Sequence, residues 1–163
     1  MNWSAAAWTL RAISKKERTR SRRQQISADR WRSREKINMS DKYLKVAVKA
    51  ALRSGNFIKN SVGKINSISY KSRNNLVTDV DKASERMIIG AIESAFPGHS
   101  FLAEESAPSE RKSAYKWIID PLDGTSNFTR AFPFFCVSIA LERNGELLCG
   151  VVYDPMRDEL FTA

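Results

Sequence analysis

The sequence predicts an α+β fold, and three observations support this prediction. Two segments, one after Asp41 and one ending at Pro97, carry apolar residues at helical spacing. Short apolar runs that end in acidic residues are typical of buried strands. An Asn-Gly pair between two longer apolar runs is the strongest short signal for a β-hairpin. Two helices combined with mostly antiparallel strands in this order define the α+β class.

Basic residues concentrate at the start of the chain. The 163 residues suffice for one ordinary domain, and the formal net charge is +9. Eleven Lys and Arg against three Asp and Glu fall in residues 1–38, a net charge of +8, whereas residues 39–163 are nearly balanced at +1. A basic nucleic-acid-binding face on the folded part is therefore not expected. No apolar stretch reaches the ~20 residues that a membrane span needs.

Residues 1–38 are predicted to be a disordered basic extension. Residues 14–36 are rich in Arg and Ser, and the chain begins without the apolar run of roughly 7–15 residues that a secretory signal requires. Translation that starts at Met39 is a second interpretation. Organellar targeting and nonspecific contact with nucleic acid are alternatives. The expected organisation is an extension over 1–38 and one cytoplasmic α+β domain over 39–163.

The first half of that domain should contain two helices joined by a β-like segment. The first helix spans residues 41–62, with Ser40 or Asp41 as its cap. Residues 64–72 alternate and favour a strand. The second helix follows a short extended piece, begins at Thr78 or Asp79 and is ended by Pro97 and Gly98. Its expected apolar stripe comprises Met87, Ile88, Ala91, Ile92 and Ala95.

The second half should contain strands over "SFLAEE", "YKWIID" and "ELFTA", and a hairpin over residues 134–153. A two-residue Asn-Gly loop pairs Arg143 with Glu146. Counting outward, Cys136 should face Tyr153 and Cys149 should face Ala140. The two cysteines are therefore not expected to be partners, and small buried hydrophobic thiols in a reducing compartment are the favoured interpretation.

The stretch "IIDPLDGTSNF" combines several groups that bind ions. Asp120 closes an apolar run, Pro121 interrupts the strand ladder, and Gly124 permits a positive φ. Residues from Thr125 onward can open a helical turn whose first N–H groups bind anions. Asp120 and Asp123 offer oxygen ligands that suit Mg²⁺. The stretch could equally be only a turn, since Asp-Pro and Asp-Gly are common turn formers, and residue types alone leave both interpretations open.

Two further acidic motifs precede this stretch. Glu104 and Glu105 end one strand-like run, and Asp79 and Asp81 open a helix. Like charges that converge without a cation would raise each other's pKa values, whereas a divalent ion would stabilise them.

"WIIDPLDGTSNF", preceded by "NLVTDVDKASE" and "FLAEES", resembles the inositol monophosphatase family of magnesium-dependent, lithium-sensitive phosphatases. The resemblance covers residues 43–163, and "TSNF" followed by "FPFFCVSIAL" is closer to the inositol-phosphate branch than to the adenosine bisphosphate branch. It implies the N-terminal part of a layered αβαβα fold. It also implies Mg²⁺ as cofactor, a small phosphorylated substrate such as an inositol monophosphate, and a homodimer in full-length members.

The resemblance assigns roles to residues at matching positions. The catalytic residues would be Thr125, Asp81 and Glu104. The ligands of one Mg²⁺ would be Glu104, Asp120 and the carbonyl of Leu122, and a second Mg²⁺ would lie between Asp120 and Asp123. The phosphate-binding residues would be Gly124, Thr125 and Ser126. One metal would lower the pKa of the attacking water and the other would stabilise the leaving alkoxide.

The resemblance also sets an expectation about completeness. Family members continue into a second half that carries a Trp-Asp motif, and none of the four tryptophans here is followed by aspartate. The chain is therefore expected to be an N-terminal portion with little or no turnover of its own. The expected activity is inositol-1-monophosphatase. The alternatives are a non-catalytic module that binds protein, or RNA through its basic extension, and a phosphatase for fructose bisphosphate, histidinol phosphate or a nucleotide phosphate.

Overall fold

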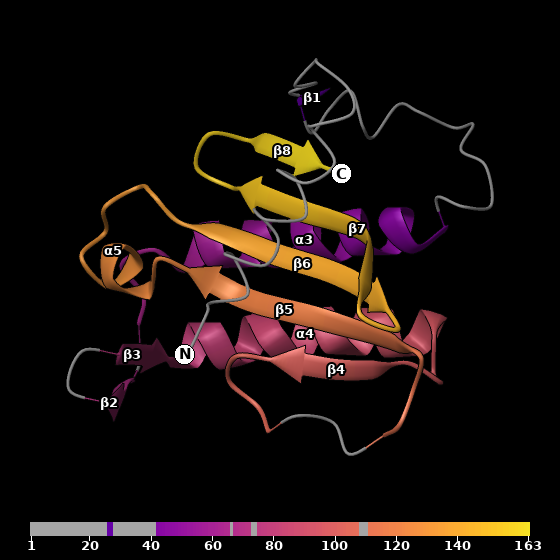
Figure 1. The fold of residues 1–163 in the computed structure, drawn as a ribbon. Coiled ribbons are helices and arrows are strands. Elements are labelled where there is room, and N and C mark those ends of the chain that lie inside the picture. Colours follow the sequence, from indigo (N-terminus) through magenta and orange to yellow (C-terminus); the bar gives the residue numbers. More distant parts are fainter. Residues whose placement is uncertain (1–25, 28–41, 66, 73–74, 108–110) are drawn as a thin grey trace.

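A mixed six-stranded sheet with two helices on one face forms the body of the molecule (Figure 1). The structure is a computed structural model that describes residues 26–27, 42–65, 67–72, 75–107 and 111–163. The combination of packed helices and a largely antiparallel sheet confirms the predicted α+β class. The predictions for residues 1–38 lie outside the described residues, except at Ile26 and Ser27.

The two long helices pack side by side across the same face of the sheet (Figure 1). Helix α3 (Lys42–Ser61) forms where the apolar stripe of residues 41–62 predicts it, and Val48, Ala51 and Ile58 are fully buried. Its predicted cap residues lie outside the described residues. Gly55 of α3 meets the ring of Tyr153, and a Cβ added there would lie 2.5 Å from two ring carbons. A glycine costs helix stability, but here it allows the sheet to approach the helix closely.

Helix α4 (Asp79–Ala95) begins with a capping box that the sequence predicts only in part. Thr78 is the N-cap, its side chain accepts hydrogen bonds from the N–H groups of Val80 and Asp81, and the Asp81 carboxylate accepts from the Thr78 N–H at 2.8 Å. This reciprocal arrangement satisfies donors that a helix start leaves open. Of the predicted apolar stripe, Ile88 and Ile92 are fully buried, whereas the remainder is only partly covered.

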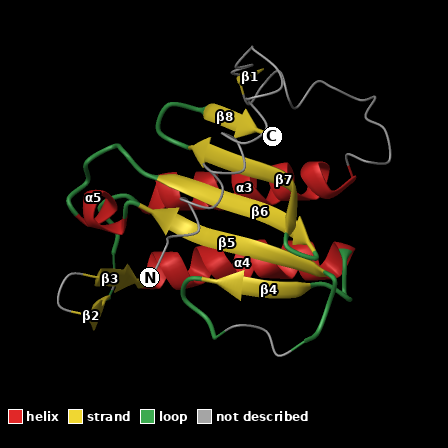
Figure 2. Cartoon of the chain, viewed as in Figure 1, coloured by secondary structure: helices red, strands yellow, loops and turns green. Residues whose placement is uncertain are grey.

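The sheet has the order β1-β8-β7-β6-β5-β4 (Figure 2). Strands β4 (Ser100–Ala103) and β5 (Tyr115–Asp123) are parallel, whereas β5, β6 (Cys136–Arg143), β7 (Glu146–Asp154) and β8 (Glu159–Thr162) are antiparallel in succession. The short strand β1 (Ile26–Ser27) pairs with β8. A separate hairpin of β2 (Ile68–Ser72) and β3 (Asn75–Thr78) leads into α4.

The hairpin between β6 and β7 confirms the predicted turn but corrects the predicted register. Asn144 and Gly145 have φ values of 51° and 84°, as a type I′ turn requires, and Arg143 pairs with Glu146. Beyond the turn, the predicted pairs of Ala140 with Cys149 and of Cys136 with Tyr153 are wrong. A shift between Leu141 and Glu142 adds one residue to β7, so that Leu141 faces Cys149 and Val137 faces Tyr153.

The extra residue in β7 is a β-bulge, and counting outward from a turn cannot detect one.

Neither cysteine forms a disulfide, as the sequence predicts.

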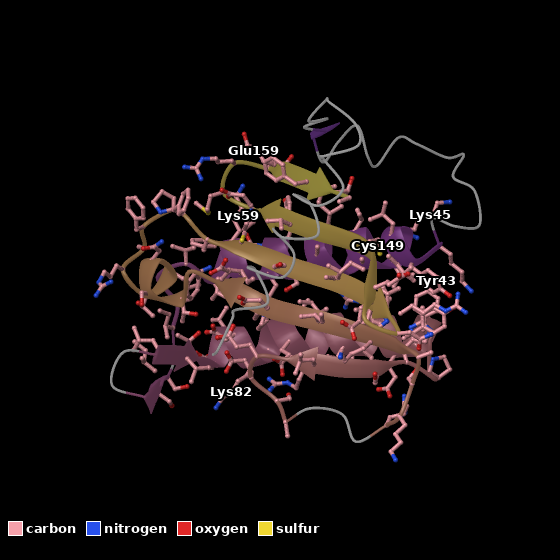
Figure 3. The ribbon with its side chains drawn as sticks, in the orientation of Figure 1. Tyr43, Lys45, Lys59, Lys82, Cys149 and Glu159 are labelled. Atoms are coloured by element: carbon pink, nitrogen blue, oxygen red, sulfur yellow. The ribbon has the colours of Figure 1, made fainter. Side chains whose placement is uncertain are left out.

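Aromatic side chains anchor the end of the sheet where β4 and β5 begin. The Trp117 Nε1–H donates to Nδ1 of His99 at 3.0 Å, and the His99 ring stacks on Tyr115 with 4.6 Å between centroids. Burial lowers the pKa of His99. Tyr43 also contacts this group and lies at the right in Figure 3, whereas Lys82 of α4 lies at the lower left. No helix among the described residues is long and apolar enough to cross a membrane.

Candidate active site

Acidic side chains meet where the parallel strands β4 and β5 end. Ala103 of β4 lies opposite Ile119 of β5, and the Glu104 N–H donates to the Ile119 carbonyl at 3.2 Å. Because the two strands run in the same direction, this register places Glu104 beside Asp120, and Glu104 raises the pKa of the Asp120 carboxyl group. The predicted strands that end in acids therefore bring their acids together.

A β-bulge adds Asp123 to the same site. Asp120 pairs with Ser138 and Asp123 pairs with Cys136, so three steps along β5 match two steps along β6. In a regular strand, residues three apart point to opposite faces of the sheet. The extra residue corrects this difference, and the charges of Glu104 and Asp123 both act on Asp120. Pro121 lies within the bulge, where the absence of an N–H costs no regular ladder bond.

The carboxyl groups of Asp120 and Asp123 hold protons more tightly than isolated ones. Burial, together with repulsion from Glu104 and Asp123, raises the pKa of Asp120 to about 9. Asp120 is only 2% exposed, and the hydrogen bond that it accepts from the Leu122 N–H, at 3.3 Å, offsets little of this effect. Burial and the charge of Glu104 also raise the pKa of Asp123. Such mutual repulsion is what a divalent cation would relieve.

The donor set fits a hard divalent cation in its chemistry. Carboxylate and carbonyl oxygens are the ligands that Mg²⁺ prefers, and Glu104, Asp120, Asp123 and the Leu122 carbonyl supply them. As they stand, the described residues contain no group of three or more His, Cys, Asp or Glu side chains arranged to hold a metal ion. Binding would therefore require Asp120 to lose its proton and the acidic side chains to rotate toward one point.

The Thr125 hydroxyl is held by a buried carboxylate. It lies 2.8 Å from Oδ1 of Asp81 and 3.1 Å from the carbonyl oxygen of Leu122. Its single proton favours the carboxylate, because charge-assisted hydrogen bonds are the stronger ones. Asp81 is 1% exposed, and its other oxygen accepts from the N–H and the hydroxyl of Thr78. The capping box of α4 therefore also fixes Thr125.

The predicted phosphate-binding turn follows directly. Gly124 has a φ of 99° and is the N-cap of the short helix α5 (Thr125–Thr129). A Cβ at Gly124 would lie 3.0 Å from the carbonyl oxygen of Phe134, so both conformation and space favour glycine. The first N–H groups of a helix have no acceptor within it, and here they belong to Thr125 and Ser126.

Three residues beside the site were not predicted from the sequence. Ser84 and Glu85 of α4 are buried and contact the segments that follow β4 and end β5. Their spacing from Asp81, three and four residues, is the available signal. Cys136 lies with its sulfur 4.0 Å from Oδ2 of Asp123, and burial followed by repulsion from Asp123 raises the pKa of its thiol strongly.

Comparison with known proteins identifies this arrangement. A model of the inositol monophosphatase family matches residues 39–163. The chain belongs to this family. The protein "Nus factor SuhB" of Pasteurella multocida is 46% identical over 123 residues, which are 74% of this chain and 46% of that protein. "Inositol monophosphatase 2" of Solanum lycopersicum is 41% identical over 128 residues, which are 76% of this chain and 48% of that protein.

Solved structures agree with the fold of this family member. Extragenic suppressor protein suhB of Bartonella henselae superimposes with a TM-score of 0.72 at 40% identity, over 74% of this chain and 48% of that one. An IMPase/NADP phosphatase solved with Mg²⁺ and phosphate gives a TM-score of 0.63 at 28% identity, over 76% and 46%. The family and its fold are confirmed, and the chain spans about half the length of the relatives that it matches.

Proposed function

We propose that this chain carries the metal- and phosphate-binding part of a Mg²⁺-dependent phosphate monoester hydrolase. The supporting observation is that Glu104, Asp120 and Asp123 converge beside a Thr125 hydroxyl that Asp81 holds. Glu104, Asp120 and the Leu122 carbonyl would hold one Mg²⁺, and Asp120 and Asp123 would contribute to a second. When bound, the metal ions would promote ionisation of a water molecule and neutralise the leaving oxygen.

Thr125 would orient the attacking water. With its proton donated to Asp81, the Thr125 oxygen can only accept a further hydrogen bond, and a water proton is the natural donor. Both oxygens of Asp81 accept hydrogen bonds, from Thr125 and from Thr78, which holds the carboxylate as the acceptor of the Thr125 proton. The N–H groups of Gly124 and Thr125, with Ser126 beside them, would bind the phosphate oxygens through donors at a helix start.

We propose inositol 1-phosphate as the substrate class to test first. The family description and the name of the tomato relative support an inositol phosphate. The name of the IMPase/NADP phosphatase keeps nucleotide phosphates among the alternatives, with fructose bisphosphate and histidinol phosphate. Turnover by the 163 residues alone should be low, because the Trp-Asp motif that the family resemblance assigns to the second metal site is not among them.

Binding and turnover test this proposal separately. The chain and its Asp120→Asn variant are incubated with inositol 1-phosphate and Mg²⁺, while ³¹P NMR follows bound ester and colorimetry follows released phosphate. The proposal expects Mg²⁺-dependent binding of the ester that the variant loses, with slow release. Binding that is the same with Mg²⁺ and with a chelator would contradict the proposed site. Rapid release that disappears in the variant would instead refute the low-turnover expectation.

A second candidate function is a non-catalytic binding module. Two observations favour it: the relative named as a Nus factor and the net charge of +8 in residues 1–38. Contacts between basic residues and RNA phosphates release counterions, so affinity should fall steeply as salt rises. Fluorescence anisotropy with a single-stranded RNA at low and at physiological salt, with and without residues 1–38, measures this. Equal RNA affinity in both chains would exclude the extension as the binding element.

A further inference from the structure

One face of α4 carries three buried polar residues that do not belong to its apolar stripe. Asp81, Ser84 and Glu85 are 1%, 0% and 2% exposed. Residues at i, i+3 and i+4 share one face of a helix, so all three point the same way. Buried polar groups are retained at a cost unless their hydrogen bonds are satisfied. The partners of these three residues show what they do.

Each of the three residues reaches a different segment of the candidate site. Asp81 accepts from Thr125 in the phosphate turn at 2.8 Å. The Ser84 hydroxyl donates to the carbonyl of Pro121, between the two aspartates of β5, at 2.8 Å. The Glu85 carboxylate accepts from the Glu105 N–H at 2.7 Å, immediately after Glu104. Two stretches far apart in sequence, residues 105–106 and 121–125, are therefore held by one helix.

Glu85 makes two hydrogen bonds to the segment that follows Glu104. Its second oxygen accepts from the Ser106 hydroxyl, so the carboxylate spans the two residues that follow Glu104. Hydrogen bonds to an ionised acceptor are about twice as strong as neutral ones.

The Ser84 contact is also well defined. The Ser84 proton is committed to Pro121, so the Ser54 hydroxyl, 2.6 Å away, must donate to the Ser84 oxygen. Helix α3 thereby orients the hydroxyl that holds the bulge.

We propose that Ser84 and Glu85 are positioning residues for the metal site. Glu85 fixes the backbone after Glu104, and Ser84 fixes the backbone between Asp120 and Asp123, so that α4 sets the spacing of the metal ligands. This inference rests on the proposed function for its purpose, but the attachment itself is a property of the metal-free chain. Groups that orient the metal-binding residues influence metal affinity, and loss of one such group typically weakens metal binding about 10–100-fold.

Two measurements on Glu85 variants test the proposal. The first is Mn²⁺ affinity by electron paramagnetic resonance for the wild-type chain, Glu85→Ala and Glu85→Gln. The second is hydrogen exchange of the Glu105 amide without metal. Glutamine can accept from the Glu105 N–H through its oxygen and donate to the Ser106 oxygen through its amide. Glu85→Gln keeps both hydrogen bonds without the charge and should therefore lie closer to the wild type than Glu85→Ala, which should bind Mn²⁺ at least about tenfold more weakly than the wild type.

Hydrogen exchange tests the positioning role of Glu85 independently of the proposed metal-binding function. In Glu85→Ala, the Glu105 amide should exchange at least about tenfold faster, because a hydrogen bond to a charged acceptor is lost. If the wild type binds no Mn²⁺, the proposed function fails and exchange alone decides the attachment. An unchanged exchange rate, or a Glu85→Gln variant as impaired as Glu85→Ala in Mn²⁺ affinity, would overturn the positioning role.

Matched control variants test whether weaker Mn²⁺ binding results only from lower stability of the fold. Ile92→Val loosens the packing of α4 without touching a site segment, since Ile92 is fully buried in the apolar core. It should leave Mn²⁺ affinity unchanged, and equal weakening would count against the proposal. Ser84→Ala should weaken Mn²⁺ binding more than Ser54→Ala, which keeps the bond from Ser84 to Pro121. Equal effects of these two serine variants would remove Ser84 from the proposal.

Discussion

Replacing Asp120 by asparagine should change how the stability of the metal-free chain depends on pH. In the folded chain, burial and two neighbouring carboxylates keep Asp120 protonated up to a pKa of about 9. In the unfolded chain the same group loses its proton near its ordinary value of about 3.9. Between these values the folded state binds one more proton than the unfolded state. The stability from this proton is fully present at low pH and is lost as pH rises towards 9.

The size of the effect follows from linkage. A difference of one bound proton changes the free energy of unfolding by about 1.4 kcal/mol for each pH unit. The wild-type chain should therefore lose about 1.4 kcal/mol between pH 7 and pH 8 through Asp120. The asparagine of the Asp120→Asn variant would be neutral in both states and would remove this contribution. His99, whose pKa is lowered by burial, adds only a small slope of opposite sign in this window, because an unfolded histidine titrates near pH 6.5 and is already mostly neutral; this slope is the same in both chains.

Urea unfolding at pH 7.0, 7.5 and 8.0 in the presence of a chelator measures both slopes. The Asp120→Asn variant should show a slope smaller than the wild type by about 1.4 kcal/mol per pH unit. A Glu93→Gln variant is the matched control, since Glu93 is exposed on α4 and pairs with Arg111. Parallel slopes for the wild type and Asp120→Asn would show that Asp120 is ionised in the folded chain, and crowding of the carboxyl groups would then not control their protonation.

Three further predictions concern metal and glycines. Mg²⁺ should stabilise the wild type more at pH 8 than at pH 6, because protons compete for the same oxygens. At a hundredfold excess of Mg²⁺ over its dissociation constant, the free energy of unfolding should rise by about 2.7 kcal/mol. An equal thermal shift at both pH values would contradict this competition. Gly124→Ala should lower the free energy of unfolding by about 1–3 kcal/mol, because alanine is strained at a φ of 99°; an unchanged urea midpoint would count against the strained turn. Gly55→Ala should lower the free energy of unfolding by about 1–3 kcal/mol, because its methyl group would overpack against the Tyr153 ring. Gly90→Ala has open space around it and should stabilise α4 by about 0.8–1 kcal/mol. Similar free energies of unfolding for both variants would refute the close contact at Gly55.

Patterns within one segment predicted most of the helices and turns, because these elements depend mainly on residues close together in the sequence. The apolar spacing of residues 41–62 and the Asn144-Gly145 turn correctly predicted α3 and the β6–β7 hairpin. The hairpin register failed beyond Leu141, because a bulge depends on how neighbouring strands twist and pack. The parallel pairing of β4 with β5 was not predicted either, since it joins segments across a long connection.

In the candidate site, too, local features could be predicted whereas contacts between distant segments could not. Residues within one motif, such as Asp120 and Asp123, could be selected from their types and spacing. The sequence could not show that Glu104 lies beside Asp120, because that proximity depends on strand order. Glu85 was missed for the opposite reason: a charged residue on a helix is usually solvated, and only the structure shows it buried against the segment after Glu104.

Mn²⁺ binding to the metal-free chain at pH 7.5 tests the central claim, that these carboxylates form a divalent-cation site, most directly. Electron paramagnetic resonance would compare the wild type with Asp120→Asn, Asp123→Asn and the distant Glu93→Gln. We expect saturable binding by the wild type and Glu93→Gln, and binding at least about tenfold weaker in both aspartate variants. Indistinguishable Mn²⁺ affinities in all four chains would contradict the claim.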